Sequence, residues 1–85
     1  MHPIGCKMWG VLVDSKYEKE VGLRIRYYRE QKKMTQDQLS TKLQLRGCDI
    51  TRSALAKMEV GQRHIYLDEI KLIVELLGVE YTDLL

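Results

Sequence analysis

The 85-residue sequence predicts an all-α fold: one domain of five short helices, preceded by an N-terminal arm at residues 1–14. Four observations support this fold class. Apolar residues recur at steps of three and four from residue 17 onward, as they do on one face of a helix. Glycines stand where these runs stop, and an apolar fraction of 45% suits one small core. Only residues 9–13 come near the alternation of a strand.

The first helix is expected from Ser15 to about Lys32, with its firm part beginning near Val21. Ser15 and Glu18 are three residues apart, which is the spacing of a capping box. Gly22 is expected to weaken the first turns, because glycine is a poor helix former. The apolar face of this helix comprises Tyr17, Val21, Ile25 and Tyr28.

The second helix is expected to begin at Thr35 or Gln36 and to stop at Gly47. Thr35 and Gln38 repeat the capping-box spacing, and glycine commonly follows the last residue of a helix. The apolar edge of this helix comprises Leu39, Leu43 and, more loosely, Leu45.

Three further helices follow the same logic. Thr51 is a good N-cap for the third helix, which should end at Gly61 and bury a narrow edge made of Ala54, Leu55 and Met58. The fourth helix should stop at Gly78 and has a broad apolar face made of Leu67, Ile70, Ile73, Val74 and Leu77. A last apolar cluster predicts a short fifth helix and comprises Val79, Tyr81, Leu84 and Leu85.

The net charge of +2 conceals a division along the chain. Residues 21–63 contain ten basic and four acidic side chains, whereas residues 64–85 contain one basic and five acidic ones. A basic middle beside an acidic end predicts that one face of the protein meets a polyanion and another does not. On charge alone, an ordinary solvated helical surface is the alternative.

The sequence gives no support for an enzyme, a membrane protein or a metalloprotein. No apolar run approaches the roughly 20 residues of a membrane helix, and residues 1–14 lack the features of a signal peptide, so we expect a soluble cytoplasmic protein. Cys6 and Cys48 should be free thiols, since two distant cysteines make no disulfide framework. The only histidines, His2 and His64, lie in no catalytic motif. A zinc site made of these four residues would lack the close paired spacing of structural zinc, so we expect no metal and no cofactor.

Four segments, in order, resemble the helix-turn-helix family of phage Cro and repressor proteins, also called Xre-like. They are LRIRYYRE, MTQDQLSTKL, ITRSALAKMEVGQR and LDEIKLIVELLGVEYTDLL, and the resemblance covers residues 21–85. It implies a lambda-repressor-like DNA-binding domain at residues 15–85, whose recognition helix at about 51–60 enters the major groove. The implied function is sequence-specific binding of double-stranded DNA by a homodimer that acts as a small transcriptional regulator. The dimer surface is expected in the acidic, apolar C-terminal half of the chain.

The resemblance also implies roles for particular residues. Base contacts are expected from Thr51, Arg52, Ser53, Ala56 and Lys57, of which Arg52 and Lys57 could donate to guanine O6 and N7. The alternative for these two cations is contact with phosphate or solvent only. Phosphate contacts are expected from Gln36, Gln62, Arg63 and His64, with Arg46 as a further candidate; His64 and Arg46 also suit a plain polar surface. Arg29 and Glu59 are expected to form an internal ion pair that fixes the third helix against the first.

Three departures from the family pattern stand out. Ser40 replaces a usual alanine and is small enough to be harmless. Lys33 replaces a common glycine before the second helix, which predicts strain in a left-handed turn. The connection between the second and third helices is about five residues longer than usual, so we expect the second helix to gain a turn that Gly47 caps. This insertion, at residues 44–49, leaves the angle of the recognition helix open.

A second hypothesis belongs to another class: a protein-interaction module, such as an antitoxin or the partner subunit of a regulator. The insertion and the apolar arm favour it slightly. The arm itself has two interpretations, a segment folded back over the core and a segment that pairs with a second subunit.

Overall fold

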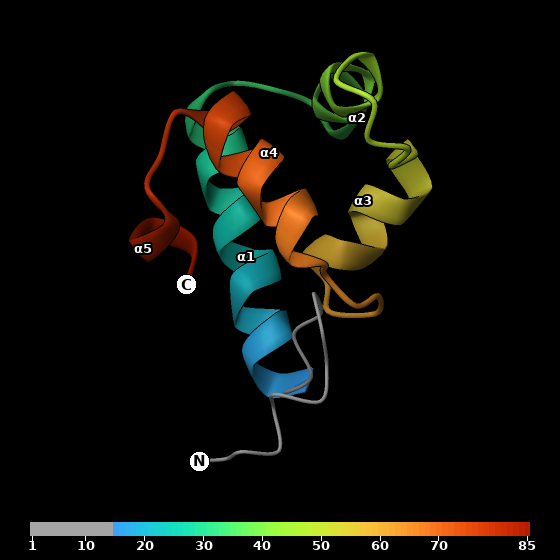
Figure 1. The fold of residues 1–85 in the computed structure, drawn as a ribbon. Coiled ribbons are helices and arrows are strands. Elements are labelled where there is room, and N and C mark those ends of the chain that lie inside the picture. Colours follow the sequence, from blue (N-terminus) through green and yellow to red (C-terminus); the bar gives the residue numbers. More distant parts are fainter. Residues whose placement is uncertain (1–14) are drawn as a thin grey trace.

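The computed structural model describes residues 15–85, so the predicted arm at 1–14 lies outside the described residues. Within 15–85 the chain forms five helices and no strand, as predicted: α1 (Ser15–Gln31), α2 (Gln36–Leu45), α3 (Arg52–Glu59), α4 (Leu67–Leu77) and α5 (Tyr81–Leu84). In Figure 1, α1 runs through the middle of the molecule, with α2 and α3 to one side and α5 to the other. Helix α1 packs against α3, α4 and α5, and α2 packs against α3 and α4. None of these helices has the length and apolar character needed to cross a membrane.

The starts of α2 and α3 are capped as the sequence predicts. Thr35 Oγ1 accepts a hydrogen bond from Gln38 N at 3.0 Å, and Gln38 Oε1 accepts one from Thr35 N at 2.8 Å, which completes a capping box. Thr51 Oγ1 accepts a hydrogen bond from Ala54 N at 3.1 Å. Glu18, the acidic member of the capping box predicted at the start of α1, accepts a hydrogen bond from the backbone N–H of Ile65 at 3.2 Å. The Ser15 side chain lies outside the part that the structure describes, so that capping box stays a prediction.

The helix ends follow one pattern. After α2, Gly47 N donates to Gln44 O at 3.0 Å and Cys48 N donates to Leu43 O at 2.9 Å, which is a Schellman motif with Gly47 in the left-handed region at φ 84°. The same pair of bonds closes α3 and α4, with glycines 61 and 78 at the left-handed position. At the end of α1 that position is held by Lys33, whose φ of 57° makes it the one non-glycine residue of positive φ in 15–85. The predicted left-handed turn at Lys33 is therefore present.

One hydrophobic core joins all five helices. It comprises Val21, Ile25, Leu39, Leu43, Ile50, Leu55, Met58, Ile65, Ile70, Ile73, Val74, Leu77 and Leu84. Two predicted core positions are wrong. Leu45 is 81% exposed, because 100° of rotation per residue carries it to the face of α2 opposite Leu39 and Leu43. Leu67 is exposed because it is the first residue of α4, and the buried residues of this helix begin only at Glu69 and Ile70.

Gly22 has a packing role that its helix propensity hides. The helix does not weaken there, since α1 is continuous from Ser15 to Gln31. A Cβ atom on Gly22 would lie 2.2 Å from Met58 O and 3.0 Å from the carbonyl carbon of Glu59. Only a residue without a side chain lets the backbones of α1 and α3 approach this closely.

Candidate nucleic-acid interface

Helix α3 buries a narrow edge and leaves its other faces open. Leu55 and Met58 are fully buried, whereas Arg52, Ser53 and Lys57 are exposed. Within residues 15–85 neither Arg52 nor Lys57 forms an ion pair or a side-chain hydrogen bond. Two cationic side chains on one short helix are therefore free to bind an external ligand.

The other predicted base-contacting residues hold different places on the same helix. Thr51 is the N-cap, and its Oγ1 already accepts from Ala54 N. Ser53 is exposed in the first turn, and Ala56 is half-buried one turn later. The structure thus brings Arg52, Ser53 and Lys57 to the surface together, with Thr51 at the rim as a capping residue.

The C-terminal end of α3 is tied to α1 by the ion pair expected between Arg29 and Glu59. Arg29 Nε donates to Glu59 Oε2 at 2.7 Å, and Arg29 Nη2 donates to Glu59 Oε1 at 3.0 Å. Arg29 Nη1 also donates to Met34 O at 2.7 Å, so one guanidinium joins α1, the α1–α2 turn and α3. Both side chains are buried, and removal of one partner from such a pair costs about 3–5 kcal/mol. The pair fixes how α3 sits on the domain.

Gln36, a predicted phosphate-contacting residue, is the first residue of α2 and is half-buried. Its Nε2 donates to Glu59 Oε1 at 3.0 Å, so its amide is held by the same carboxylate that binds Arg29. One Nε2 hydrogen remains for an external acceptor.

Arg63 and His64 lie in the turn after α3, and each faces a carboxylate. Arg63 Nη1 and Nη2 donate to the two carboxylate oxygens of Glu69 at 2.9 and 3.0 Å, and hydrogen bonding to Glu69 raises the pKa of the Arg63 guanidinium. His64 Nδ1 lies 3.0 and 3.1 Å from the two oxygens of Glu18. Together with Gly61 and Gln62 these residues line a hollow of about 320 Å³.

The remaining two phosphate candidates differ from each other. The exposed Gln62 side chain makes no hydrogen bond within residues 15–85. Arg46 Nη2 lies 2.6 Å from Glu75 Oε1, so the candidate in the insertion is paired across the surface with α4. Both members of that pair are exposed, which makes it a weak tether.

The insertion itself is well packed. Gln44 Nε2 donates to Ile50 O at 3.1 Å, which ties the end of α2 to the segment entering α3. Cys48 packs against the core, and its burial raises the pKa of the thiol. Cys48 is a free thiol, as the sequence predicts, and packs there as a small apolar side chain.

Sequence reasoning missed Glu18 and Glu69 as parts of this surface. Both lie on helices where a glutamate usually faces solvent, and their partners are 46 and 6 residues away. Glu69 Oε1 accepts from Tyr66 N, three residues earlier, as in a capping box, but tyrosine is not a usual N-cap residue and the sequence does not predict it.

Comparison with known proteins identifies the architecture. The family described as helix-turn-helix matches residues 25–84. The DNA-binding domain of BldD superimposes with a TM-score of 0.73 at 23% identity, over 86% of this chain and 99% of that chain. The corresponding S. venezulae BldD domain gives 0.70 at 23% identity, over 82% and 97% of the two chains. No curated protein sequence matches the chain.

A third solved structure is slightly closer in sequence. The restriction-modification controller protein C.AhdI from Aeromonas hydrophila matches with a TM-score of 0.71 at 28% identity, over 84% of this chain and 96% of that chain. These neighbours share the all-helical arrangement seen here, and the family match covers every helix from the middle of α1 to α5. The chain therefore belongs to the helix-turn-helix family, as its resemblance to Xre-like and Cro-like proteins implies.

Proposed function

We propose that this protein is a small cytoplasmic transcriptional regulator that binds double-stranded DNA sequence-specifically, with α3 in the major groove. The observation that carries the proposal is the free outer face of α3, where Arg52 and Lys57 have no partner among residues 15–85. The major groove of B-DNA, about 12 Å wide, admits one helix. The family match and the structural likeness to the DNA-binding domain of BldD and to the controller protein C.AhdI support the same function.

Within this proposal the two cations of α3 read bases. Arg52 stands in the first turn of α3, and recognition helices contact base edges mainly with their N-terminal residues. Its planar fork can donate to both O6 and N7 of guanine, and Lys57 can donate to the same atoms. Ser53 and Ala56 lie between them, where small side chains allow the helix to approach the groove floor.

Phosphate contacts then come from the rim of α3. Gln36 lies at the start of α2, where free backbone N–H groups attract anions. Gln62, Arg63 and His64 follow the end of α3 and border one hollow. These contacts position the protein on the duplex without reading its sequence.

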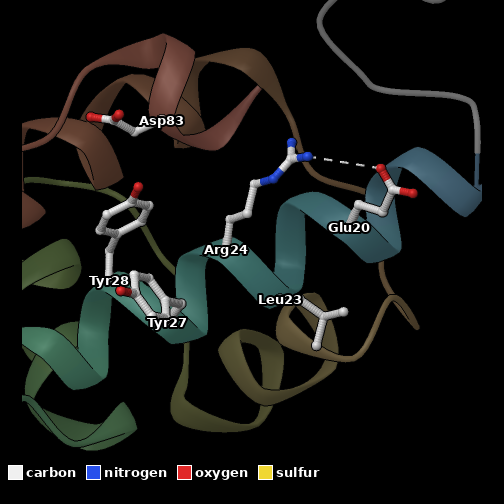
Figure 2. Close-up of a pocket in the computed structure, with 6 residues that line it drawn as sticks. All are labelled: Glu20, Leu23, Arg24, Tyr27, Tyr28 and Asp83. Carbon is white, nitrogen blue, oxygen red and sulfur yellow. Dashed lines mark ion pairs between the residues drawn. The ribbon is translucent and has the colours of Figure 1, made fainter.

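We also propose that the protein binds DNA as a homodimer through its C-terminal half. At the end of the chain, Tyr81 and Leu85 are exposed although they are large and apolar. Beside them, α1 and α5 border a hollow of about 330 Å³, lined by Glu20, Leu23, Arg24, Tyr27, Tyr28 and Asp83 (Figure 2). In that view Arg24 reaches from α1 toward α5 and pairs with Glu20. A two-fold dimer would place two α3 helices on half-sites one turn of DNA apart.

Selection of bound duplexes from a random library tests the function, with the wild type, Arg52→Ala and Gln62→Ala compared. We expect Arg52→Ala to relax the preference at one base position by about 1–3 kcal/mol, because a base-reading fork is lost. Gln62→Ala should weaken binding to all DNA sequences alike, because a contact with phosphate does not depend on the base sequence. Lys71→Ala, an exposed lysine on α4, is the control and should change neither profile.

A palindromic preference would support the dimer as well. Identical preference profiles for the wild type and Arg52→Ala, with equal affinities, would refute the base-reading role.

One observation favours a second function, a protein-interaction module. Leu45 is 81% exposed on the outer face of α2 and belongs to a hollow of about 620 Å³ that three lysines border: Lys32, Lys33 and Lys42. A salt titration with random duplex DNA separates the two functions, because phosphate-dominated binding falls with a slope of roughly −0.9 per phosphate contact. Absence of binding even at low salt would favour the protein partner.

A further inference from the structure

Three glutamates are buried in residues 15–85, and each holds one of the predicted phosphate-contacting side chains. Glu59 is 1% exposed and accepts from Gln36, Glu69 is 8% exposed and accepts from Arg63, and Glu18 is 3% exposed and faces His64. Their positions on three different helices, α1, α3 and α4, show that sequence proximity does not explain the pattern.

The Arg63–Glu69 pair is the most complete of the three. Nη1 donates to Glu69 Oε1 and to His64 O, at 2.9 and 3.0 Å, and Nη2 donates to Glu69 Oε2 at 3.0 Å. A guanidinium has five N–H donors, so one hydrogen on Nη2 and the Nε hydrogen remain for another acceptor. Glu69 is itself fixed, because its Oε1 accepts from Tyr66 N at the start of α4.

A carboxylate behind a phosphate donor has two opposite effects. Its negative charge repels the DNA backbone and weakens binding. Its hydrogen bonds hold the guanidinium in one orientation, which lowers the conformational entropy that a long, flexible side chain loses on binding. If removal of the carboxylate weakens DNA binding, the carboxylate positions the cation. If removal strengthens DNA binding, the carboxylate only neutralises the cation.

We propose that Glu69 is a positioning residue, which holds Arg63 with its free N–H donors turned toward a DNA phosphate beside the end of α3. This inference rests on the proposed function. The same geometry extends to Gln36, whose remaining Nε2 hydrogen is kept available by Glu59. The domain thus fixes two of its predicted phosphate donors, Gln36 and Arg63, before DNA arrives.

The test measures affinity for a fluorescent 20-base-pair duplex of random sequence, because phosphate contacts need no operator. Glu69→Gln removes the charge and the bidentate acceptor but keeps the capping box, which glutamine also completes. Asp68→Asn is the matched control, since it removes the same charge from the exposed neighbouring residue of α4. Arg63→Ala and the double variant Arg63→Ala with Glu69→Gln complete the cycle.

We expect Asp68→Asn to bind the duplex as tightly as the wild type or slightly more tightly, because one repulsive charge is gone. Glu69→Gln should bind roughly threefold or more weakly despite the same change in charge. In the Arg63→Ala background, Glu69→Gln should cause no further loss of affinity for the duplex. If Glu69 had only a structural role, its replacement would lower the affinity in both backgrounds. Denaturant unfolding of each variant checks that the fold is kept.

If Glu69→Gln tightens binding as Asp68→Asn does, or if its effect persists without Arg63, the inference is wrong while the proposed function stands. If the wild type binds no duplex at low salt, both are wrong. Should Glu69→Gln unfold, Arg63→Lys decides the matter, because lysine keeps the charge but loses the fork that Glu69 holds. It should weaken binding nearly as much as Arg63→Ala, and wild-type affinity would contradict the positioning role.

Discussion

At the scale of single residues, the basic side chains around α3 fall into two classes. Arg52 and Lys57 have no partner within residues 15–85, whereas Arg29, Arg46 and Arg63 each face a carboxylate. All five are predicted to contact DNA or to form an ion pair, but a carboxylate partner is predicted only for Arg29, through the family resemblance. The division matters for function because a free cation contributes its full charge and all its donors to a ligand.

Lys33 has a backbone conformation that is unfavourable for a residue with a side chain. Its φ of 57° lies in the left-handed region, where the Cβ atom of an L-residue is crowded. We expect Lys33→Gly to stabilise the domain by about 0.5–1 kcal/mol, which raises Tm by a few degrees in thermal unfolding.

Gly47→Ala is the matched control for this change. Gly47 has a φ of 84° and open space around its Cβ position, so alanine there meets the conformational cost alone. It should destabilise the domain by about 1 kcal/mol. A lower Tm for Lys33→Gly would mean that the lysine side chain stabilises the turn by a contact that outweighs its strain.

At the scale of elements, α3 depends on its neighbours for its place. Its inner edge has only Leu55 and Met58 as fully buried apolar side chains, and α1 supports it through the Arg29–Glu59 pair and the close crossing at Gly22. A helix of eight residues is too short to be stable alone, so these contacts supply most of its stability. The narrow edge is what leaves the remaining faces available.

Gly22→Ala tests the crossing of α1 and α3. Helix propensity alone predicts that alanine stabilises α1 by about 1 kcal/mol. The crossing predicts the opposite, because the new Cβ would lie 2.2 Å from the backbone oxygen of Met58 and must push the helices apart. We expect a net loss of about 1–3 kcal/mol in urea unfolding. A stabilised Gly22→Ala variant would show that the two helices have room to spare.

At the scale of the whole molecule, local signals in the sequence were sufficient to predict the helices but not to predict which side chains pair on the surface. The helix limits could be predicted because their signals are local. They are the N-caps Thr35 and Thr51 and the C-terminal glycines 47, 61 and 78. The pairing of Glu18 with His64 joins residues 46 positions apart. No spacing rule reaches that far, because such pairs depend on how the helices pack. The role of Gly22 also depends on how the helices pack. Its helix propensity therefore predicted a weakened helix and did not predict the close approach of α1 and α3.

The whole molecule also separates its charges. The basic stretch at residues 21–63 contains α2 and α3, whereas residues 64–85, which contain α4 and α5, have five acidic side chains and one basic one. This separation orients the α3 side toward a polyanion and leaves the acidic half for contacts between subunits, as the proposed dimer requires.

Removal of guanine N7 atoms from the DNA tests whether α3 reads bases in the major groove. In a duplex obtained by selection, each guanine is replaced in turn by 7-deazaguanine, which removes the N7 acceptor from the major groove only. We expect affinity to fall roughly fivefold at one guanine or more, and the fall to vanish at the matching position in Arg52→Ala or Lys57→Ala. Equal affinity for every substituted duplex, or a fall that both variants retain in full, would contradict this role of α3.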